Sequence, residues 1–190
     1  MAKSMRSRTP LTPARVIDEA LALVNEEGLE ALTLRSLASR LGVQNPALYW
    51  HVANKQALID GMAHRIIDDM VANAPSPKLR WDRWLTGVAV AFRSALLGTR
   101  DGARIVASAD LSAARRVGQL EEAIAHLTAA GFDREDARVG VLAVFDYTLG
   151  ASFEEQADPG VAAAERKRAR IDTFRGGLGL FIAGLQSRLR

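Results

Sequence analysis

Residues 33–55 read TLRSLASRLGVQNPALYWHVANK, and this stretch decides the fold of the N-terminal part of the chain. Thr33 suits the N-cap of a helix, because its hydroxyl can accept hydrogen bonds from the free N–H groups of the first turn. Apolar side chains then follow at i, i+3, i+4 and i+7, namely Leu34, Leu37, Ala38 and Leu41. This spacing predicts one buried helix face. Gly42 predicts the end of the helix, where a left-handed residue is common.

A second short helix is expected after this turn. Asn45 suits its N-cap and Pro46 its first position, where the missing N–H costs nothing. A small core is predicted to receive the side chains of Val43, Leu48 and Val52. Trp50 is interpreted as a further core residue. The side chains expected to face outward are Asn45, Ala47, Tyr49, His51 and Lys55. Two short helices joined by a tight turn indicate a helix-turn-helix, whose second helix lies in the DNA major groove.

Helical periodicity continues on both sides of this motif. Upstream, Thr12 and Pro13 mark a helix start and Gly28 its end. Downstream, helices are expected over about 55–71, 81–97, 113–130, 134–156 and 171–189, and Asp133 suits the N-cap of the fourth of these. Prolines within 73–77 form a linker. No strand pattern of useful length is present, so the sequence predicts an all-α protein with domains at 1–56 and 57–190.

Composition limits the classes of function. The chain has 190 residues, 48% hydrophobic, no cysteine and a net charge of +3. The absence of cysteine excludes disulfides, thiolate nucleophiles and zinc–thiolate sites, and it fits the cytoplasm. No apolar run is long enough to cross a membrane. A basic tail of Lys3, Arg6 and Arg8 either neutralises DNA phosphates or is a solvated terminus.

Among the possible classes of function, an enzyme is the least favoured. The histidines His51, His64 and His126 are widely separated and lack metal-ligand spacing. Asp146 and Glu154 stand two turns apart on one expected helix, roughly on one face. Such a pair can in principle exchange protons, but pocket polarity or ion pairing explains it more simply. We therefore expect no catalytic residue, no metal site and no cofactor.

Glycine and alanine are frequent in the expected helices 134–156 and 171–189. A glycine inside a helix costs about 1 kcal/mol relative to alanine, so repeated glycines indicate close helix packing. A symmetric homodimer formed through these two helices is the preferred explanation. Ordinary packing within one chain is the alternative. A dimer also suits paired helix-turn-helix units, which read half-sites about one DNA turn apart.

Several of these segments resemble the tetracycline-repressor (TetR) family of bacterial regulators. The similarity lies in Leu41-Gly-Val, Pro46-Ala-Leu-Tyr-Trp-His-Val and Asn54-Lys55, and it continues in Arg100-Asp-Gly-Ala103, Gly131-Phe132 and Tyr147-Thr-Leu-Gly150. The resemblance covers nearly the whole chain. It implies an all-helical homodimer with N-terminal DNA-binding heads and a C-terminal domain that dimerises and encloses a small-molecule effector.

By the same resemblance, DNA would be contacted by Arg35, Asn45, Pro46, Ala47, Tyr49, His51 and Lys55. Asn45 can pair with adenine, and Arg35 can reach guanine or phosphate. Tyr49, His51 and Lys55 suit phosphates, which position a protein without specifying sequence.

The corresponding ligand positions are Val71, Val88, Phe92, Val106, Ala123, Asp146 and Glu154. Val106 stands where the tetracycline-binding members carry a histidine that holds the magnesium of the drug, and valine cannot coordinate a hard cation. The pocket should therefore be more apolar, with Asp146 and Glu154 as its main polar groups. We expect an effector other than magnesium–tetracycline, either hydrophobic or cationic.

These observations predict a cytoplasmic, ligand-responsive regulator that binds operator DNA as a homodimer and most simply acts as a repressor. Two alternatives remain at this point: a DNA-binding regulator that activates transcription or has no effector, and a small helical enzyme.

Overall fold

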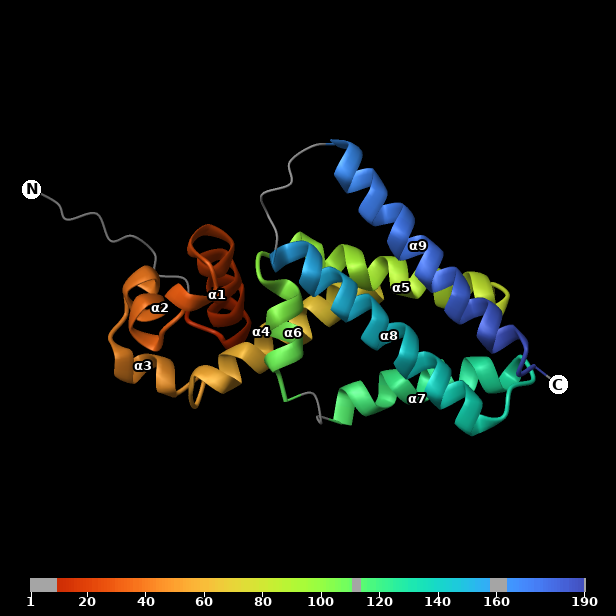
Figure 1. The fold of residues 1–190 in the computed structure, drawn as a ribbon. Coiled ribbons are helices and arrows are strands. Elements are labelled where there is room, and N and C mark those ends of the chain that lie inside the picture. Colours follow the sequence, from red (N-terminus) through yellow and green to blue (C-terminus); the bar gives the residue numbers. More distant parts are fainter. Residues whose placement is uncertain (1–9, 111–113, 158–163, 190) are drawn as a thin grey trace, which may run out of the picture.

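The computed structural model describes residues 10–110, 114–157 and 164–189, and all regular structure within these ranges is helical. The elements are α1 (Pro13–Glu27), the 3-10 turn η1 (Leu29–Ala31), α2 (Leu34–Leu41), α3 (Asn45–Tyr49), α4 (Lys55–Ala72), α5 (Trp81–Gly98), α6 (Gly102–Ser108), α7 (Ala114–Ala129), α8 (Arg134–Ala157) and α9 (Ala164–Gln186). Figure 1 shows α1–α3 gathered at one end of the molecule and the long helices α5, α7, α8 and α9 at the other, with α4 running between them. The all-α prediction is confirmed.

The signals for the helix ends around the helix-turn-helix hold with one exception. The Thr33 hydroxyl accepts a hydrogen bond from the Ser36 N–H at 2.9 Å, and Gly42 ends α2 in the left-handed conformation with φ 65° and ψ 32°. The prediction that Asn45 is the N-cap of the next helix is wrong. Gln44 holds that position, and Asn45 is the first residue of α3. The Asn45 amide is therefore not used to cap its own helix.

The later helices that the sequence predicts agree closely in their boundaries, apart from the last, and α6 was not predicted as a helix. Asp133 accepts a hydrogen bond from the Glu135 N–H at 2.9 Å, as its expected capping role requires. However, α9 begins at Ala164, seven residues before the predicted start. Residues 164–170 are alanine, glutamate, arginine and lysine, which are strong helix formers, but they lack the apolar spacing used to find helices. The basic tail of Lys3, Arg6 and Arg8 lies outside the described residues.

Helix α4 connects the two ends of the molecule. Asn54 caps its start by accepting a hydrogen bond from the Ala57 N–H at 2.9 Å. Its first half packs on α1 so closely that a Cβ at Gly61 would lie 2.4 Å from the Ile17 side chain. One continuous buried cluster runs from Val16 in α1, along α4, to Val106 in α6. The unit of α1, α2 and α3, called the head below, is therefore not isolated from the rest of the molecule. A movement of α4 would change the position of the head.

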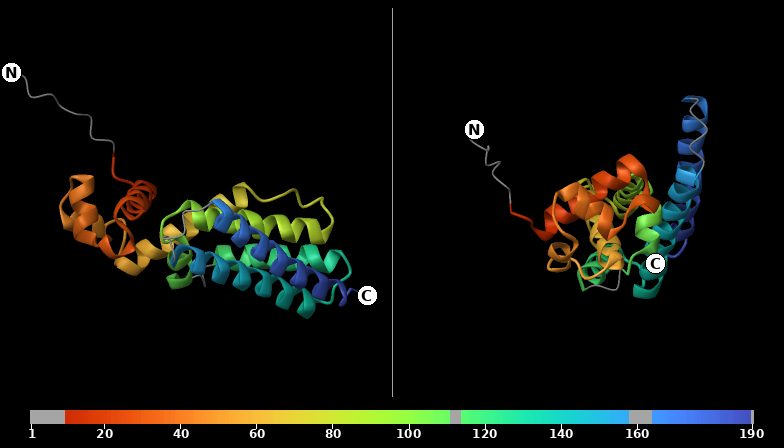
Figure 2. Two further views of the ribbon diagram at one scale, coloured as in Figure 1. Left: turned by 45° about the horizontal axis from the view of Figure 1, so that its top comes forward. Right: turned by 90° about the vertical axis from the view of Figure 1, so that its left-hand side faces the viewer.

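The remaining helices pack around α8, which contacts α5, α6, α7 and α9. Gly140 of α8 lies against Leu185, and Gly177 of α9 lies against Tyr147, at distances that leave no room for a Cβ. Part of the glycine content is thus explained by packing within one chain. The right-hand view of Figure 2 shows α8 and α9 standing along one edge of the molecule.

Candidate nucleic-acid interface and ligand pocket

The outer face of α3 carries the side chains predicted to face outward. Asn45 and Pro46 are exposed at its start, and Tyr49 is 57% exposed at its end. Ala47 and His51 are half-buried. Arg35, at the start of α2, and Lys55, at the start of α4, are also exposed on the head. The face combines amide, phenol and cationic groups, which suit base edges and phosphates.

Trp50 does not lie in the core, and its interpretation as a core residue is wrong. Its side chain is 88% exposed, whereas Leu48 is fully buried and Val52 is 7% exposed. Trp50 is the C-cap of α3 and follows Leu48 by two residues, which turns its side chain about 200° around the helix axis from that of Leu48. This placement could have been read from the sequence, because fixing Leu48 and Val52 inward forces Trp50 outward. An exposed tryptophan beside Tyr49 is a further candidate contact that sequence reasoning missed.

A cluster of ion pairs joins α1 and α2 within the head. The Arg40 guanidinium of α2 donates to both carboxylate oxygens of Glu26 at 2.7 Å and to Glu19 at 3.1 Å. These hydrogen bonds lower the pKa of Glu26 and raise that of Arg40. Both acids belong to α1, so the cluster fixes α2 on α1.

A second set of polar contacts joins the head to the C-terminal helices. The Arg100 N–H donates to Asn25 Oδ1 at 2.8 Å, and the Arg100 guanidinium donates to the Glu26 carbonyl at 2.8 Å. The Leu29 N–H donates to Asp101 Oδ2 at 2.8 Å. Since Asp101 is the N-cap of α6, these bonds attach the end of α1 to the start of α6. No local sequence signal predicts them, because the partners are more than 70 residues apart.

A cavity of about 1070 Å³ lies among α4, α5, α6, α7 and α8. Six of the seven predicted ligand positions line it: Val71, Val88, Phe92, Val106, Ala123 and Asp146. Ile67, Met70, Trp84 and Phe145 extend its apolar wall. The structure thus brings together residues from five helices that are distant in sequence.

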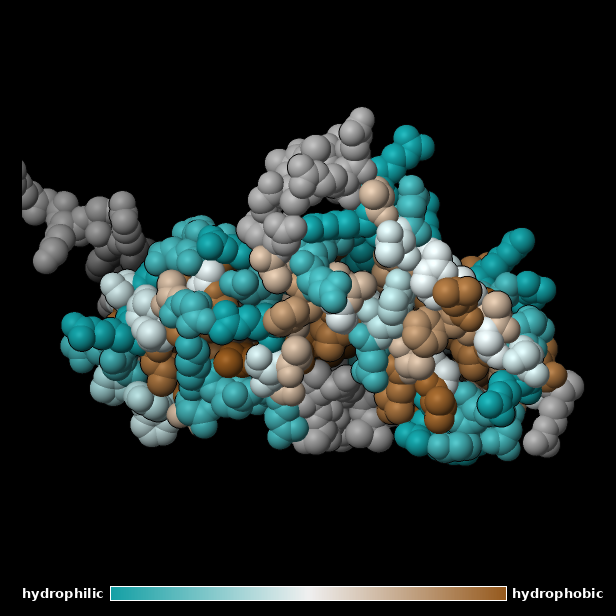
Figure 3. All heavy atoms as spheres, viewed as in Figure 1, coloured by the Kyte–Doolittle hydropathy of each residue, from teal (hydrophilic) through white to brown (hydrophobic). Residues whose placement is uncertain are grey.

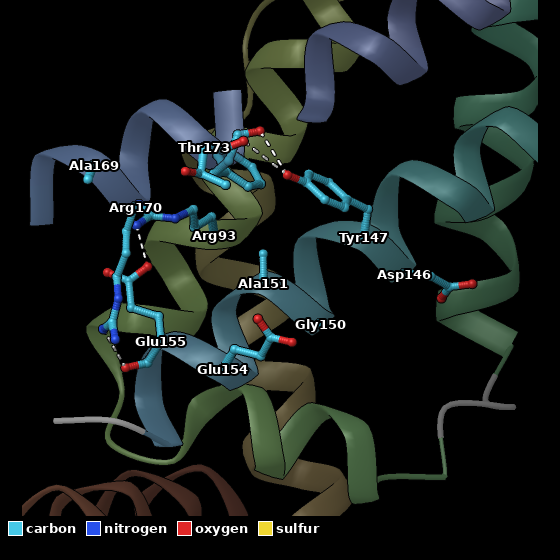
Figure 4. A pocket seen from close by; sticks show the side chains of 11 residues that line it. Arg93, Asp146, Tyr147, Gly150, Ala151, Glu154, Glu155, Ala169, Arg170 and Thr173 are labelled. Atoms are coloured by element: carbon cyan, nitrogen blue, oxygen red, sulfur yellow. Dashed lines mark hydrogen bonds and ion pairs between the residues drawn. The ribbon is translucent and has the colours of Figure 1, made fainter. Parts of the chain in front are cut away.

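Glu154 is the position that the structure does not place in this cavity. It lines a second hollow of about 800 Å³ between α8 and α9, where Arg93 forms an ion pair with Glu155 at 2.5 Å. Eight helical residues rotate the side chain by about 80°, so Asp146 and Glu154 share a face only loosely. Figure 4 shows Asp146 set apart from the other labelled side chains. Asp146 lines this hollow as well as the larger cavity, so the two acids share the smaller hollow, whereas the larger cavity contains Asp146 without Glu154.

The polar groups of the larger cavity come mainly from α7. Gln119, Glu122 and His126 line it together with Ala123. These residues follow the spacing i, i+3, i+4 and i+7 and therefore share one face of α7, but three of them are polar, so apolar spacing does not mark this face in the sequence. His126 packs on Trp84 with ring centroids 4.3 Å apart. Burial lowers the pKa of His126.

The outer faces of α8 and α9 carry exposed apolar side chains. Val139 and Phe153 are exposed on α8, and Leu180 (77%) and Phe181 on α9. A Cβ added at Gly150, Gly176, Gly179 or Gly184 would meet nothing within 4 Å. Figure 3 shows hydrophobic atoms gathered over this part of the molecule. These glycines, unlike Gly140, leave open space for a neighbour.

Two family models match the chain. Residues 16–62 match "Bacterial regulatory proteins, tetR family", and residues 74–173 match "Tetracyclin repressor-like, C-terminal domain". The tetracycline repressor protein class A from transposon 1721 of Escherichia coli is 44% identical over 153 residues, which is 78% of this chain and 69% of that protein.

Two solved structures have the same fold as this chain over nearly its whole length. A single-residue variant of TetR from Acinetobacter baumannii AYE, in complex with minocycline, superposes with a TM-score of 0.85 at 38% identity and covers 94% of this chain and 98% of that one. BioQ with its double-stranded DNA operator superposes with a TM-score of 0.77 at 29% identity, covering 94% and 99%. Within the described residues, no helix is long and apolar enough to cross a membrane.

Proposed function

This chain belongs to the tetR family of bacterial regulatory proteins and is a DNA-binding transcriptional regulator rather than an enzyme, and we propose that it represses transcription as a homodimer. In this proposal the α3 faces of two heads bind operator DNA, and a small molecule in the cavity releases it. The domain boundary at 56/57 and a cytoplasmic site of action, where operator DNA is found, belong to the same proposal.

The exposed face of α3 is the observation that carries DNA binding. Asn45 is free of a capping role, Tyr49 and Trp50 project from the same short segment, and Arg35 and Lys55 flank it. We assign base reading to Asn45, with Arg35, and apolar contact to Pro46 and Ala47. Tyr49, His51 and Lys55 are assigned to phosphates. The BioQ complex supports this use of the head, because that relative is seen on its DNA operator.

The residues that line the cavity favour an effector other than magnesium–tetracycline. Val106 is buried in its wall and presents only carbon atoms, so it cannot hold a hard cation. Val71, Val88, Phe92 and Ala123 are also apolar, and Asp146 is the acid among the assigned positions. A tetracycline titration followed by fluorescence, with and without magnesium, tests this assignment. Tight binding that requires magnesium would refute it.

We assign dimerisation to helices 134–156 and 171–189, the segments that α8 and most of α9 occupy. On α9, Gly176, Leu180 and Gly184 lie four residues apart and share one face, which has open space at both glycines. On α8, Val139 and Phe153 are two heptads apart and share a face as well. Burying these surfaces against a second copy removes exposed apolar area from water. The two heads would then be held at a fixed distance.

The coupling between effector and DNA is assigned to α4 and α6. Both helices contribute to the cavity wall, α4 through Ile67, Met70 and Val71 and α6 through Val106. The start of α4 directly follows the helix-turn-helix, and the start of α6 is bonded to the end of α1. A molecule that displaces either wall would therefore move the head. Effector and operator would oppose each other by the same coupling free energy.

The test of DNA binding uses a duplex selected by the protein itself from random DNA. Fluorescence anisotropy should give an affinity that falls steeply as salt is added, because phosphate contacts release counterions. Asn45→Ala should weaken binding to the selected duplex by about 1–3 kcal/mol and relax its sequence preference. Lys55→Ala should weaken all duplexes about equally.

Asn73→Ala is the matched control, because Asn73 is an exposed amide at the far end of α4. It should leave DNA binding unchanged. If Asn45→Ala and Asn73→Ala behaved alike on the selected duplex, α3 would not be the reading element and the proposal would fail.

A further inference from the structure

The larger cavity has one buried side and one side that reaches solvent. Its buried side consists of apolar residues, among them Met70, Val88, Phe92 and Val106. The exposed lining residues come from the last turn of α4, from the linker between α4 and α5, and from α7 and α8: Val71, Ser76, Pro77, Gly118, Glu122 and Asp146. The mouth of the cavity is therefore bordered by the linker and by α7 and α8.

Four consecutive linker residues belong to the cavity wall. Residues 74–77, called the strap below, all line the cavity. The left-hand view of Figure 2 shows the linker, in yellow, running beside α5. Ala74 and Pro75 are half-buried, whereas Ser76 and Pro77 are exposed. The first half of the strap is thus packed against the body of the protein, and the second half borders the mouth.

A glycine in α5 makes room for the strap. A Cβ added at Gly87 would lie 2.7 Å from Pro75 Cγ and 3.3 Å from Pro75 Cβ, so a larger residue would displace the proline ring. Gly87 lies in the interior of α5, where glycine is less favourable than alanine. A glycine inside a helix that is kept at this cost commonly has a packing reason. Here the packing reason is the ring of Pro75.

The strap is attached by packing rather than by hydrogen bonds. The Ser76 carbonyl accepts a hydrogen bond from the Leu79 N–H at 3.1 Å, and the Ser76 hydroxyl accepts one from the Lys78 N–H at 3.3 Å, so both bonds stay within the linker. Within the described residues, no hydrogen bond joins 74–77 to α5, α7 or α8. Opening therefore has to break mainly the packing on Gly87, and a segment with so few bonds opens at low cost.

We propose that the strap is the gate of the cavity. It moves away from Gly87 to admit the effector through the mouth beside α7, and it returns to cover the bound molecule. Loops that close over a ligand separate it from water and control its release. This inference rests on the proposed function, because it assigns the route by which the effector reaches the cavity.

Labelling of a cysteine inside the cavity measures how often the strap opens. The chain has no cysteine of its own, so Val106→Cys places a single thiol in the buried wall. The probe is dithiodipyridine, which is small and neutral. The thiolate attacks its disulfide, a mixed disulfide forms on the protein, and thiopyridone leaves and is followed by its absorbance. Because a buried thiol reacts when it becomes accessible, the labelling rate follows the population of the open form.

Variants at the contact between the strap and α5 test the gate. Gly87→Ala places a methyl group where the proline ring lies, and Pro75→Ala removes the ring, so each should raise the labelling rate about tenfold. The double variant should be labelled no faster than Pro75→Ala alone, because the new methyl group then fills the space that the ring has left. Gly98→Ala is the matched control in α5, since a Cβ there would meet nothing within 4 Å. It should leave the rate unchanged.

A thiol outside the cavity distinguishes opening of the strap from unfolding. Val141 is buried in α8 and does not line the cavity, so the thiol of Val141→Cys should react at the same rate with and without Gly87→Ala. Ala123→Cys, in the cavity wall on α7, serves if Val106→Cys does not fold. An unchanged rate for the cavity thiol in both Gly87→Ala and Pro75→Ala overturns the proposal, and so does an equal rise at Val141→Cys.

Operator binding by the unlabelled protein is measured separately, by anisotropy on the selected duplex. A protein that binds its duplex, but whose cavity thiol reacts independently of the strap, retains the proposed function and loses this inference. A protein whose cavity thiol responds to the strap, but which binds no duplex, retains the gate and loses the proposed function.

Discussion

Replacing Gln156 with alanine should destabilise the junction between the head and the cavity. Gln156 stands in the last turn of α8 and is half-buried. Its amide nitrogen donates to the carbonyls of Leu96 at 3.0 Å and Thr99 at 2.7 Å, and its oxygen accepts from the Ala103 N–H at 2.9 Å. One side chain therefore closes the turn between α5 and α6.

The magnitude follows from the number of bonds lost. An intramolecular hydrogen bond contributes about 0.5–1.5 kcal/mol net, and unsatisfied buried partners add to the cost of removing it. Three bonds give roughly 3 kcal/mol of lost unfolding free energy. The better helix propensity of alanine offsets only a few tenths of a kcal/mol of this loss. Gln156→Glu should be at least as damaging at neutral pH, because it keeps the acceptor for Ala103 but faces a carboxylate toward two carbonyl oxygens.

Urea unfolding at one fixed protein concentration measures the effect, since the stability of a dimer depends on concentration. Gln186→Ala is the control, because Gln186 is exposed at the end of α9, and it should change stability by less than about 0.5 kcal/mol. A loss below that value for Gln156→Ala would refute the reasoning. Because the turn leads into α6, Gln156→Ala should also weaken operator binding in the anisotropy assay.

Gly28→Ala should destabilise the protein by about 1 kcal/mol or more in urea unfolding, because Gly28 has φ 90° and an added Cβ would lie 3.2 Å from the Arg100 guanidinium; unchanged stability would contradict this. Burial holds the pKa of His126 below its ordinary value of 6.5, so the unfolded chain binds the proton more readily. Stability should therefore fall as the pH drops below about 6.5, and the fall should be smaller in His126→Phe; equal pH profiles would exclude this cause. Leu180→Glu should shift the protein from dimer to monomer in light scattering, whereas Leu79→Glu, at an exposed site in the turn before α5, should not; a dimer in both would place the interface elsewhere.

Elements that depend on neighbouring residues were predictable from the sequence. The Thr33 cap, the left-handed Gly42 and the all-helical pattern involve contacts within a few residues, so residue type and spacing predict them. The outward position of Asn45 and Tyr49 was predicted in the same way. Trp50 was misplaced because its size was weighted above its helical position. The start of α9 was missed because residues 164–170 lack the apolar spacing on which the prediction relied.

By itself, the sequence determined where most helices begin and end and which side chains the second helix of the turn presents, since short-range hydrogen bonds and helical periodicity need no distant partner. Only the tertiary structure decided that Glu154 faces the α8–α9 hollow, that His126 Nε2 is buried beside Trp84, and that Arg100 reaches the end of α1. The physical reason is that each of these depends on how whole helices pack and rotate against one another, and no spacing within a single segment encodes that angle.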